Sequence, residues 1–270
     1  MTTVATFYRF EPQGDIDALR AEVEQTCLKR SLRGTVLLAA EGFNAALAGA
    51  RADLNYLIER HFRGVAVKWS TAAPGNPVFD RLKVRQQPEI VGFGRPLAPS
   101  TPVGERVSPS DWKRLIEDPA VLIVDVRNDY ESDVGTFHGA KRADTANFRD
   151  FPDFAMRELS EHKQRPIAMY CTGGIRCEKA SAYLLEQGFA DVRQLDGGIL
   201  GYFAEVTPDN NAFEGECFVF DQRVSVTQEL EQGSYELCET CGRPLSRDDS
   251  SGSSPVARCS ACAQFQRRTI

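Results

Sequence analysis

The chain has 270 residues, of which 42% are hydrophobic, and its formal net charge is −6. This length is typical of about two domains, and no apolar run approaches the ~18 residues of a membrane-spanning helix. The charge is uneven, with net values of +3 over residues 1–95, −5 over 100–206 and −4 over 207–270. An acidic total argues against indiscriminate nucleic-acid binding, whereas a basic first third is compatible with a localised contact.

Eight cysteines accompany an N-terminus, MTTVATFYRF, that lacks the basic and long apolar regions of a secretory signal. Cysteines in such a chain indicate a reducing compartment, where they serve metal binding or catalysis more often than disulfides. The sequence therefore predicts a cytoplasmic protein.

Residues 1–93 are predicted to form a ferredoxin-like sandwich, because short β-type runs alternate with two amphipathic helical patterns in the order strand, helix, strand, strand, helix, strand. The predicted strands are 4–10, 34–40, 45–49 and 65–70, and the predicted helices are 15–32 and 52–62. Residues 94–107 are irregular and proline-rich, which predicts an interdomain linker.

Basic side chains alternate in the segment FDRLKVR, at Arg81, Lys83 and Arg85. In a strand these three side chains share one face. Two interpretations stay open: the solvated face of an edge strand, or a strip that contacts the phosphates of RNA.

Residues 108–207 alternate helix and strand, which predicts an α/β domain with a parallel sheet covered on both faces. The predicted helices are 109–117, about 153–160, 177–188 and 199–206, and the predicted strands are 121–126, 166–170 and 192–195. Parallel sheets place their sites at the carboxyl ends of strands, and Cys171 follows the second of these strands directly.

The loop after that strand is predicted to be the active site. It comprises Cys171, Thr172, Gly173, Gly174, Ile175 and Arg176. Its two glycines permit a tight turn whose N–H groups converge on an anion, and the helix that follows adds its positive N-terminal end. Both effects favour a thiolate at Cys171, with Arg176 as a fixed positive charge. A buried structural cysteine is the alternative, and Cys177 is either a resolving thiol or a packing residue.

Oxygen-activating cofactors leave no recognisable pattern in the sequence. The three histidines, at positions 61, 138 and 162, show no facial-triad spacing. No Gly-x-Gly-x-x-Gly follows a predicted strand. We therefore find no iron motif among the histidines and no flavin motif among the glycines.

The C-terminal extension, residues 208–270, contains Cys238, Cys241, Cys259 and Cys262 with the spacing C-x2-C-x17-C-x2-C. Two such pairs can supply four thiolates tetrahedrally, which predicts one structural zinc ion. Two disulfides, or a disordered redox-active tail, are the alternatives.

The segments VLIVDVRNDYE, GTFHGA, YCTGGIRCEKASAYLLEQGF and VRQLDGGILGY resemble a rhodanese-like domain, although GTF replaces the usual Gly-His-Ile before the Gly-Ala turn. The resemblance implies that Cys171 corresponds to the persulfide-forming cysteine, in a six-residue loop like that of sulfur-handling members. It also implies that Asp125 and Arg127 match the family's Asp-x-Arg, whose ion pair braces the loop.

Together with LAAEGFNAALAG, FDRLKVR and the cysteine-rich C-terminus, these motifs resemble the bacterial tRNA uridine hydroxylase family. The resemblance implies hydroxylation of the wobble uridine to 5-hydroxyuridine, with molecular oxygen as co-substrate and the tRNA anticodon stem-loop as partner. Cys171 then acts either as a thiolate that adds to C6 of uracil or as a persulfide. A plain sulfurtransferase and a non-catalytic binding adaptor remain as alternative functions.

Overall fold

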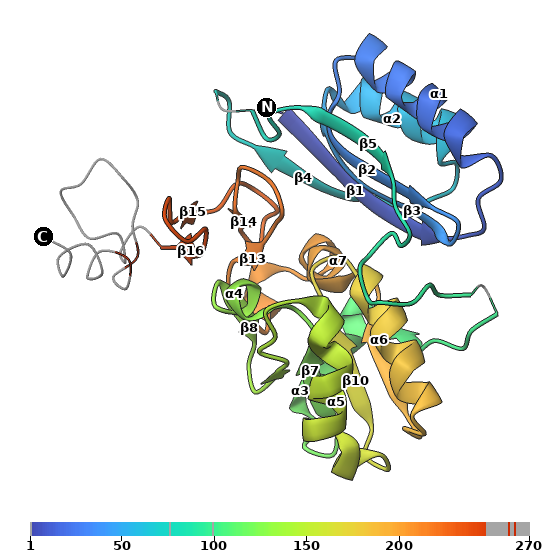
Figure 1. The fold of residues 1–270 in the computed structure, drawn as a ribbon. Coiled ribbons are helices and arrows are strands. Elements are labelled where there is room, and N and C mark those ends of the chain that lie inside the picture. The colour runs from blue at the N-terminus through green and yellow to red at the C-terminus, as the bar shows by residue number, and fades with distance from the viewer. Residues whose placement is uncertain (1, 76, 99, 247–258, 260–261, 263–270) are drawn as a thin grey trace, which may run out of the picture.

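The computed structural model describes residues 2–75, 77–98, 100–246, 259 and 262. Two α/β units follow one another along the chain, and a C-terminal segment lies beside both of them (Figure 1). Among the described residues, no helix has the length and apolar character needed to cross a membrane.

The first unit has the topology predicted for a ferredoxin-like sandwich: an antiparallel sheet in the order β4-β1-β3-β2, with both helices on one face (Figure 1). A fifth strand, β5, pairs in parallel with β2 and extends the sheet. Phe7, Phe43 and Phe62 form an aromatic cluster in its core. The elements are β1 (Thr2–Phe10), α1 (Ile16–Lys29), β2 (Arg33–Ala39), β3 (Gly42–Gly49), α2 (Arg51–His61), β4 (Lys68–Ala72) and β5 (Leu82–Gln86).

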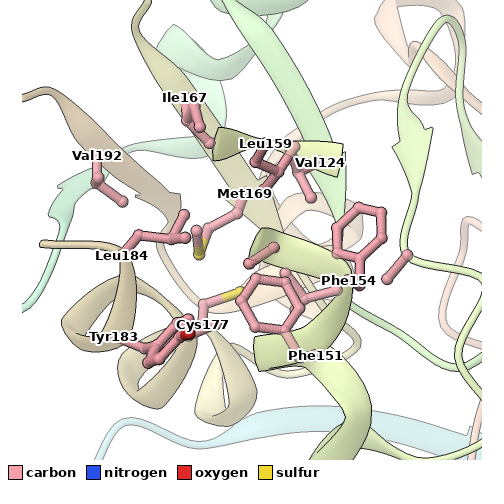
Figure 2. Close-up of a cluster of buried hydrophobic side chains, with 14 of the residues drawn as sticks. Val124, Phe151, Phe154, Leu159, Ile167, Met169, Cys177, Tyr183, Leu184 and Val192 are labelled. Atoms are coloured by element: carbon pink, nitrogen blue, oxygen red, sulfur yellow. The ribbon is translucent and has the colours of Figure 1, made fainter. Parts of the chain in front are cut away.

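The second unit is built on a parallel five-stranded sheet in the order β6-β11-β10-β7-β9. Apolar clusters cover both of its faces, and Figure 2 shows the one beneath α5 and α6. The elements are β6 (Glu105–Val107), α3 (Pro109–Glu117), β7 (Leu122–Asp125), α4 (Asp129–Ser132), β8 (Gly135–Phe137), β9 (Lys141–Arg142), α5 (Phe151–Glu158), β10 (Ile167–Tyr170), α6 (Ile175–Glu186), β11 (Val192–Leu195) and α7 (Gly198–Glu205).

The predicted linker, residues 94–107, is wrong at its C-terminal end. Glu105–Val107 form β6, which pairs with β11 and begins the second sheet. A strand of three residues with two charged side chains carries no apolar pattern, so only its pairing partner reveals it.

The C-terminal extension is not a separate tail. β12 (Phe213–Gly215) pairs with β8, and Phe213, Cys217 and Val226 pack into the core of the second unit. The remaining short strands are β13 (Cys217–Phe218), β14 (Ser225–Val226), β15 (Glu236–Leu237) and β16 (Pro244–Leu245). Of the predicted extension, residues 247–258, 260–261 and 263–270 lie outside the described residues.

Buried polar contacts fix the two units against each other. The ammonium of Lys179, on α6, lies 2.9 Å from Glu41 and 2.6 Å from Glu89, and all three side chains are buried. Arg223 of the C-terminal segment donates to Ser70 Oγ of the first unit at 2.8 Å. These contacts place the first sheet directly over the start of α6, where the predicted catalytic loop lies.

Candidate active site

Cys171 lies where β10 ends and the loop to α6 begins, as the sequence predicts. Gly174 has a φ of 96°, a left-handed conformation that favours glycine and turns the backbone toward the cysteine sulfur. The backbone N–H of Gly174 donates to Cys171 Sγ at 3.1 Å. The residue is fully buried, so a substrate reaches its sulfur only when the covering groups move aside.

The Cys171 sulfur lies among groups that favour the thiolate. Burial alone raises its pKa, but a hydrogen bond from the Cys177 thiol, the positive charge of Arg176 and backbone N–H donors outweigh burial and lower the pKa to about 6. At neutral pH the thiolate therefore predominates.

Cys177 stands in the first turn of α6, with its thiol directed among apolar side chains (Figure 2). Burial and the neighbouring Cys171 sulfur raise the pKa of Cys177 well above its ordinary value. It therefore remains protonated and acts as a hydrogen-bond donor to the Cys171 thiolate. A resolving role is compatible with this proximity and stays a prediction.

The positive charge of Arg176 is paired with a carboxylate that the sequence analysis did not predict. Its guanidinium forms a two-pronged pair with Glu131, at 2.5 and 2.7 Å, and Glu131 is fully buried. Glu131 also accepts from the hydroxyl of Thr172. The pair holds the loop in shape, and the positive charge of the arginine still acts on the Cys171 sulfur.

Asp125 and Arg127 form the expected ion pair, fully buried, at 2.6 Å. Arg127 also donates to the backbone carbonyls of Glu131 and Gly135. The pair therefore acts on the loop through α4, because it fixes the backbone that presents Glu131 to Arg176. The sequence analysis missed Glu131, although Asn128 and Glu131 form a capping box whose N-x-x-E spacing was visible.

The first turn of α7 holds the backbone of the loop through hydrogen bonds. The N–H groups of Ile199 and Leu200 donate to the carbonyls of Cys171 and Thr172, each at 3.0 Å. A Cβ at Gly198, whose φ is 64°, would lie only 2.5 Å from the Cys171 carbonyl oxygen. Glycine is therefore required for this close approach, and the LDGGIL segment was the signal for it.

Two side chains of the first unit face the loop, and no sequence motif predicted either of them. The Tyr8 hydroxyl, on β1, donates to Glu178 at 3.2 Å and lies 2.9 Å from the Cβ position of Gly174. The Lys68 ammonium, at the start of β4, lies 4.7 Å from the centre of the Tyr8 ring. The candidate active site is therefore shared between the two units.

The predicted basic strip lies at the edge of the first sheet. Lys83 and Arg85 are on β5, and Arg81 immediately precedes it. None of the three side chains forms a hydrogen bond or ion pair with another described residue. Arg81 and Lys83 line a groove of about 660 Å³, and Phe220, which is 63% exposed, lines it as well. Arg85 does not line this groove.

One aromatic side chain of this groove, Phe220, also lies near the catalytic loop. The Arg176 guanidinium lies 5.8 Å from the centre of the Phe220 ring. The Phe220 ring thus borders both the groove with the basic side chains and the arginine of the loop.

The four C-terminal cysteines come together as the spacing predicts. Their sulfur atoms lie within 4.8 Å of one another, and Cys241 Sγ and Cys259 Sγ are 3.8 Å apart. Four thiolates around zinc, with Zn–S bonds of about 2.3 Å, place neighbouring sulfurs roughly 3.8 Å apart, so this donor set fits a tetrahedral zinc ion. Arg243, in the same hairpin, pairs with Asp129 of α4 at 2.8 Å.

Comparisons with known proteins agree with this division of the chain. The family described as "UPF0176 acylphosphatase like domain" matches residues 2–90, and "Rhodanese-like domain" matches residues 108–205. Three relatives carry the name "tRNA uridine(34) hydroxylase". The Synechocystis sp. protein is 43% identical over 90% of this chain and 88% of its own length. The Synechococcus elongatus protein is 45% identical (88% and 90%), and the Mesorhizobium japonicum protein is 42% identical (98% and 87%).

Proposed function

The chain belongs to the tRNA uridine(34) hydroxylase family, and on that premise we propose that it converts uridine 34 of tRNA to 5-hydroxyuridine with Cys171 as the nucleophile. The observation that supports this most strongly is the Cys171 thiolate, with a pKa of about 6, in a loop shared by both units. Because an enzyme that acts on tRNA works where tRNA is found, we also propose a cytoplasmic location.

The thiolate form accounts for the chemistry with fewer components than a persulfide does. Hydroxylation adds one oxygen atom and no sulfur, so no transferable sulfur is needed. The Cys171 sulfur bonds to C6 of uracil, and the electron pair of the C5=C6 bond moves to C5 and O4. Carbon 5 then takes up molecular oxygen and a proton to form a hydroperoxide.

A thiol reductant completes the reaction. Two thiol groups reduce the O–O bond, so that one oxygen atom stays on C5 as a hydroxyl and the other leaves as water. The proton on C5 and the Cys171 thiolate then leave together, which restores the C5=C6 bond. The sum is uridine, oxygen and two thiols giving 5-hydroxyuridine, water and a disulfide.

Expression in cells that lack 5-hydroxyuridine tests this function. Nucleoside mass spectrometry should find the modification at position 34 when the wild-type chain is expressed. It should find none with the Cys171→Ser variant at an equal protein level. Absence of 5-hydroxyuridine with the wild-type chain would contradict the proposal.

We propose the anticodon stem-loop as the RNA element that is bound, because its unpaired bases can turn out of the stack into a protein pocket. Phosphates would contact Arg81, Lys83 and Arg85, whose side chains hold no partner among the residues that the structure describes. An unpaired base would have a stacking surface on Phe220, which lines the groove and lies 5.8 Å from the Arg176 guanidinium.

Neutralising the strip should weaken tRNA binding. Arg81→Gln, Lys83→Gln and Arg85→Gln together should raise the Kd and flatten its salt dependence, because fewer counterions are released on binding. Titrations at several salt concentrations measure both quantities. A matched variant, Lys29→Gln, Arg60→Gln and Arg63→Gln on the helix layer, should leave both unchanged. If both triple variants bind as the wild type does, the RNA is held elsewhere.

We propose that the four cysteines hold one structural zinc ion. Four thiolates fill a tetrahedral shell and leave no open position for chemistry. The ion would stabilise the β15–β16 hairpin, whose Arg243 contacts α4 beside Glu131.

Metal analysis and proteolysis check this site. Protein purified without chelators should contain close to one zinc per chain, and Cys241→Ser should contain much less. The variant should also be cleaved faster within the hairpin, since binding energy of the metal is folding energy for a small segment. If the wild-type protein contains no metal, and its hairpin is cleaved at the same rate as that of Cys241→Ser, the zinc site is ruled out.

A further inference from the structure

Three cationic side chains lie around the catalytic loop, and two of them form ion pairs with carboxylates. Arg176 pairs with Glu131, and Arg106 pairs with Glu178 at 2.6 Å. Both guanidinium groups are therefore hydrogen-bonded to a carboxylate before substrate arrives. A cation that holds no carboxylate is better placed to stabilise a negative charge that develops on the substrate beside Cys171.

Lys68 is the third cation, and it differs from the other two. Within the described part of the chain, its ammonium forms no hydrogen bond or ion pair and only faces the Tyr8 ring at 4.7 Å. Its Cε carbon lies 3.7 Å from the Cβ position of Gly197, in the turn that supports the loop. Lys68 thus lies between the two units, beside the Cys171 loop.

The surroundings of Lys68 are unfavourable for a lysine with only a structural role. Burial lowers its pKa, and the nearby Asp196 and Cys171 offset this only in part. A partly desolvated ammonium with no anion in direct contact lowers stability, and such a group is retained where a ligand supplies that contact. Tyr8 is held in place through Glu178, so the cation is positioned before substrate arrives.

We propose that Lys68 is a catalytic residue whose ammonium donates a hydrogen bond to O4 of the target uridine. This inference rests on the proposed function. When the Cys171 sulfur bonds to C6, the electron pair of the C5=C6 bond moves toward C5 and O4, and O4 gains negative charge. The ammonium stabilises that charge without transferring its proton. The first unit thereby takes part in the chemistry, in addition to holding RNA.

The test compares Lys68→Met, Lys68→Arg and the exposed control Lys29→Met in tRNA hydroxylation by the full-length protein. We expect Lys68→Met to lower kcat by about 10²–10³-fold, the loss typical of one donor to a developing oxyanion. Lys68→Arg should recover most of that loss because it keeps a positive donor. Lys29→Met should behave as the wild type does. Thermal unfolding should show Lys68→Met at least as stable as the wild type, because an unpaired charge is removed.

Three results would overturn the proposal. Unchanged kcat in Lys68→Met would show that the cation is not used. A raised KM with normal kcat would make Lys68 a phosphate contact. The pKa of Cys171 in Lys68→Met can be measured from thiolate absorbance, with Cys171→Ser as the blank. If that pKa is higher than in the wild type, Lys68 acts on the sulfur and not on the substrate. Cys171→Ser is assayed in parallel. If Cys171→Ser stays active, the proposed function fails. If Cys171→Ser is inactive and Lys68→Met is as active as the wild type, only the role of Lys68 is refuted.

Discussion

Cys171→Ser is expected to lose tRNA hydroxylation by on the order of 10³-fold or more, the scale of loss seen when a nucleophile is removed. The thiol has a pKa of about 6 and is ionised at neutral pH, whereas a serine hydroxyl in the same loop stays protonated. The two side chains are similar in size, so the fold and the tRNA Kd should be retained. Steady-state kinetics, thermal unfolding and binding titrations measure these three quantities.

Cys27→Ser is the matched control for this variant. Cys27 is buried on α1, and burial raises its pKa to about 12, so it carries no thiolate. The control should keep full activity. Substantial hydroxylation by Cys171→Ser would exclude the cysteine as the nucleophile.

Glu131→Gln is expected to lower the free energy of unfolding by about 3–5 kcal/mol, the usual effect of leaving one member of a buried ion pair without its partner. Arg176 has a side chain only 7% exposed, and Glu131 supplies both oxygens of its two-pronged contact. The amide keeps the shape of the side chain but removes the charge. Denaturant unfolding of both proteins measures the difference.

Glu214→Gln is the control for a charge that is not buried. Glu214 pairs with His138 at 3.1 Å, and both side chains are largely exposed, so its removal should change stability by less than about 1 kcal/mol. If Glu131→Gln and Glu214→Gln destabilise equally, the pair with Arg176 is not what holds the loop.

Patterns within short segments predicted the catalytic loop and the cysteine cluster, because the residues that form each of them are close in sequence or regularly spaced. The strand, the glycine turn and the helix start are contiguous in sequence, and they suffice to place Cys171 and to give the direction of its pKa shift. The spacing of the C-terminal cysteines likewise predicted their convergence. The element order of both α/β units followed from hydrophobic periodicity.

Contacts between distant segments could not be predicted in this way. Arg176 was predicted as a fixed positive charge, but its partner Glu131, 45 residues earlier in the chain, was not predicted. Lys68 and Tyr8 approach the loop only because the two units dock against each other. The residue pattern of one strand does not show which of its side chains will face the other unit. β6 is defined by its partner strand, since its own residues lack an apolar pattern.

The central claim, that Cys171 adds oxygen from O2 to uridine 34, is tested most directly by incubating purified protein with unmodified tRNA, a thiol reductant and isotopically heavy oxygen gas. Nucleoside mass spectrometry should show 5-hydroxyuridine at position 34 carrying one heavy oxygen atom, formed by the wild-type protein and not by Cys171→Ser. Unaltered uridine with the wild-type protein, unlabelled product, or labelled product from the serine variant would contradict the claim.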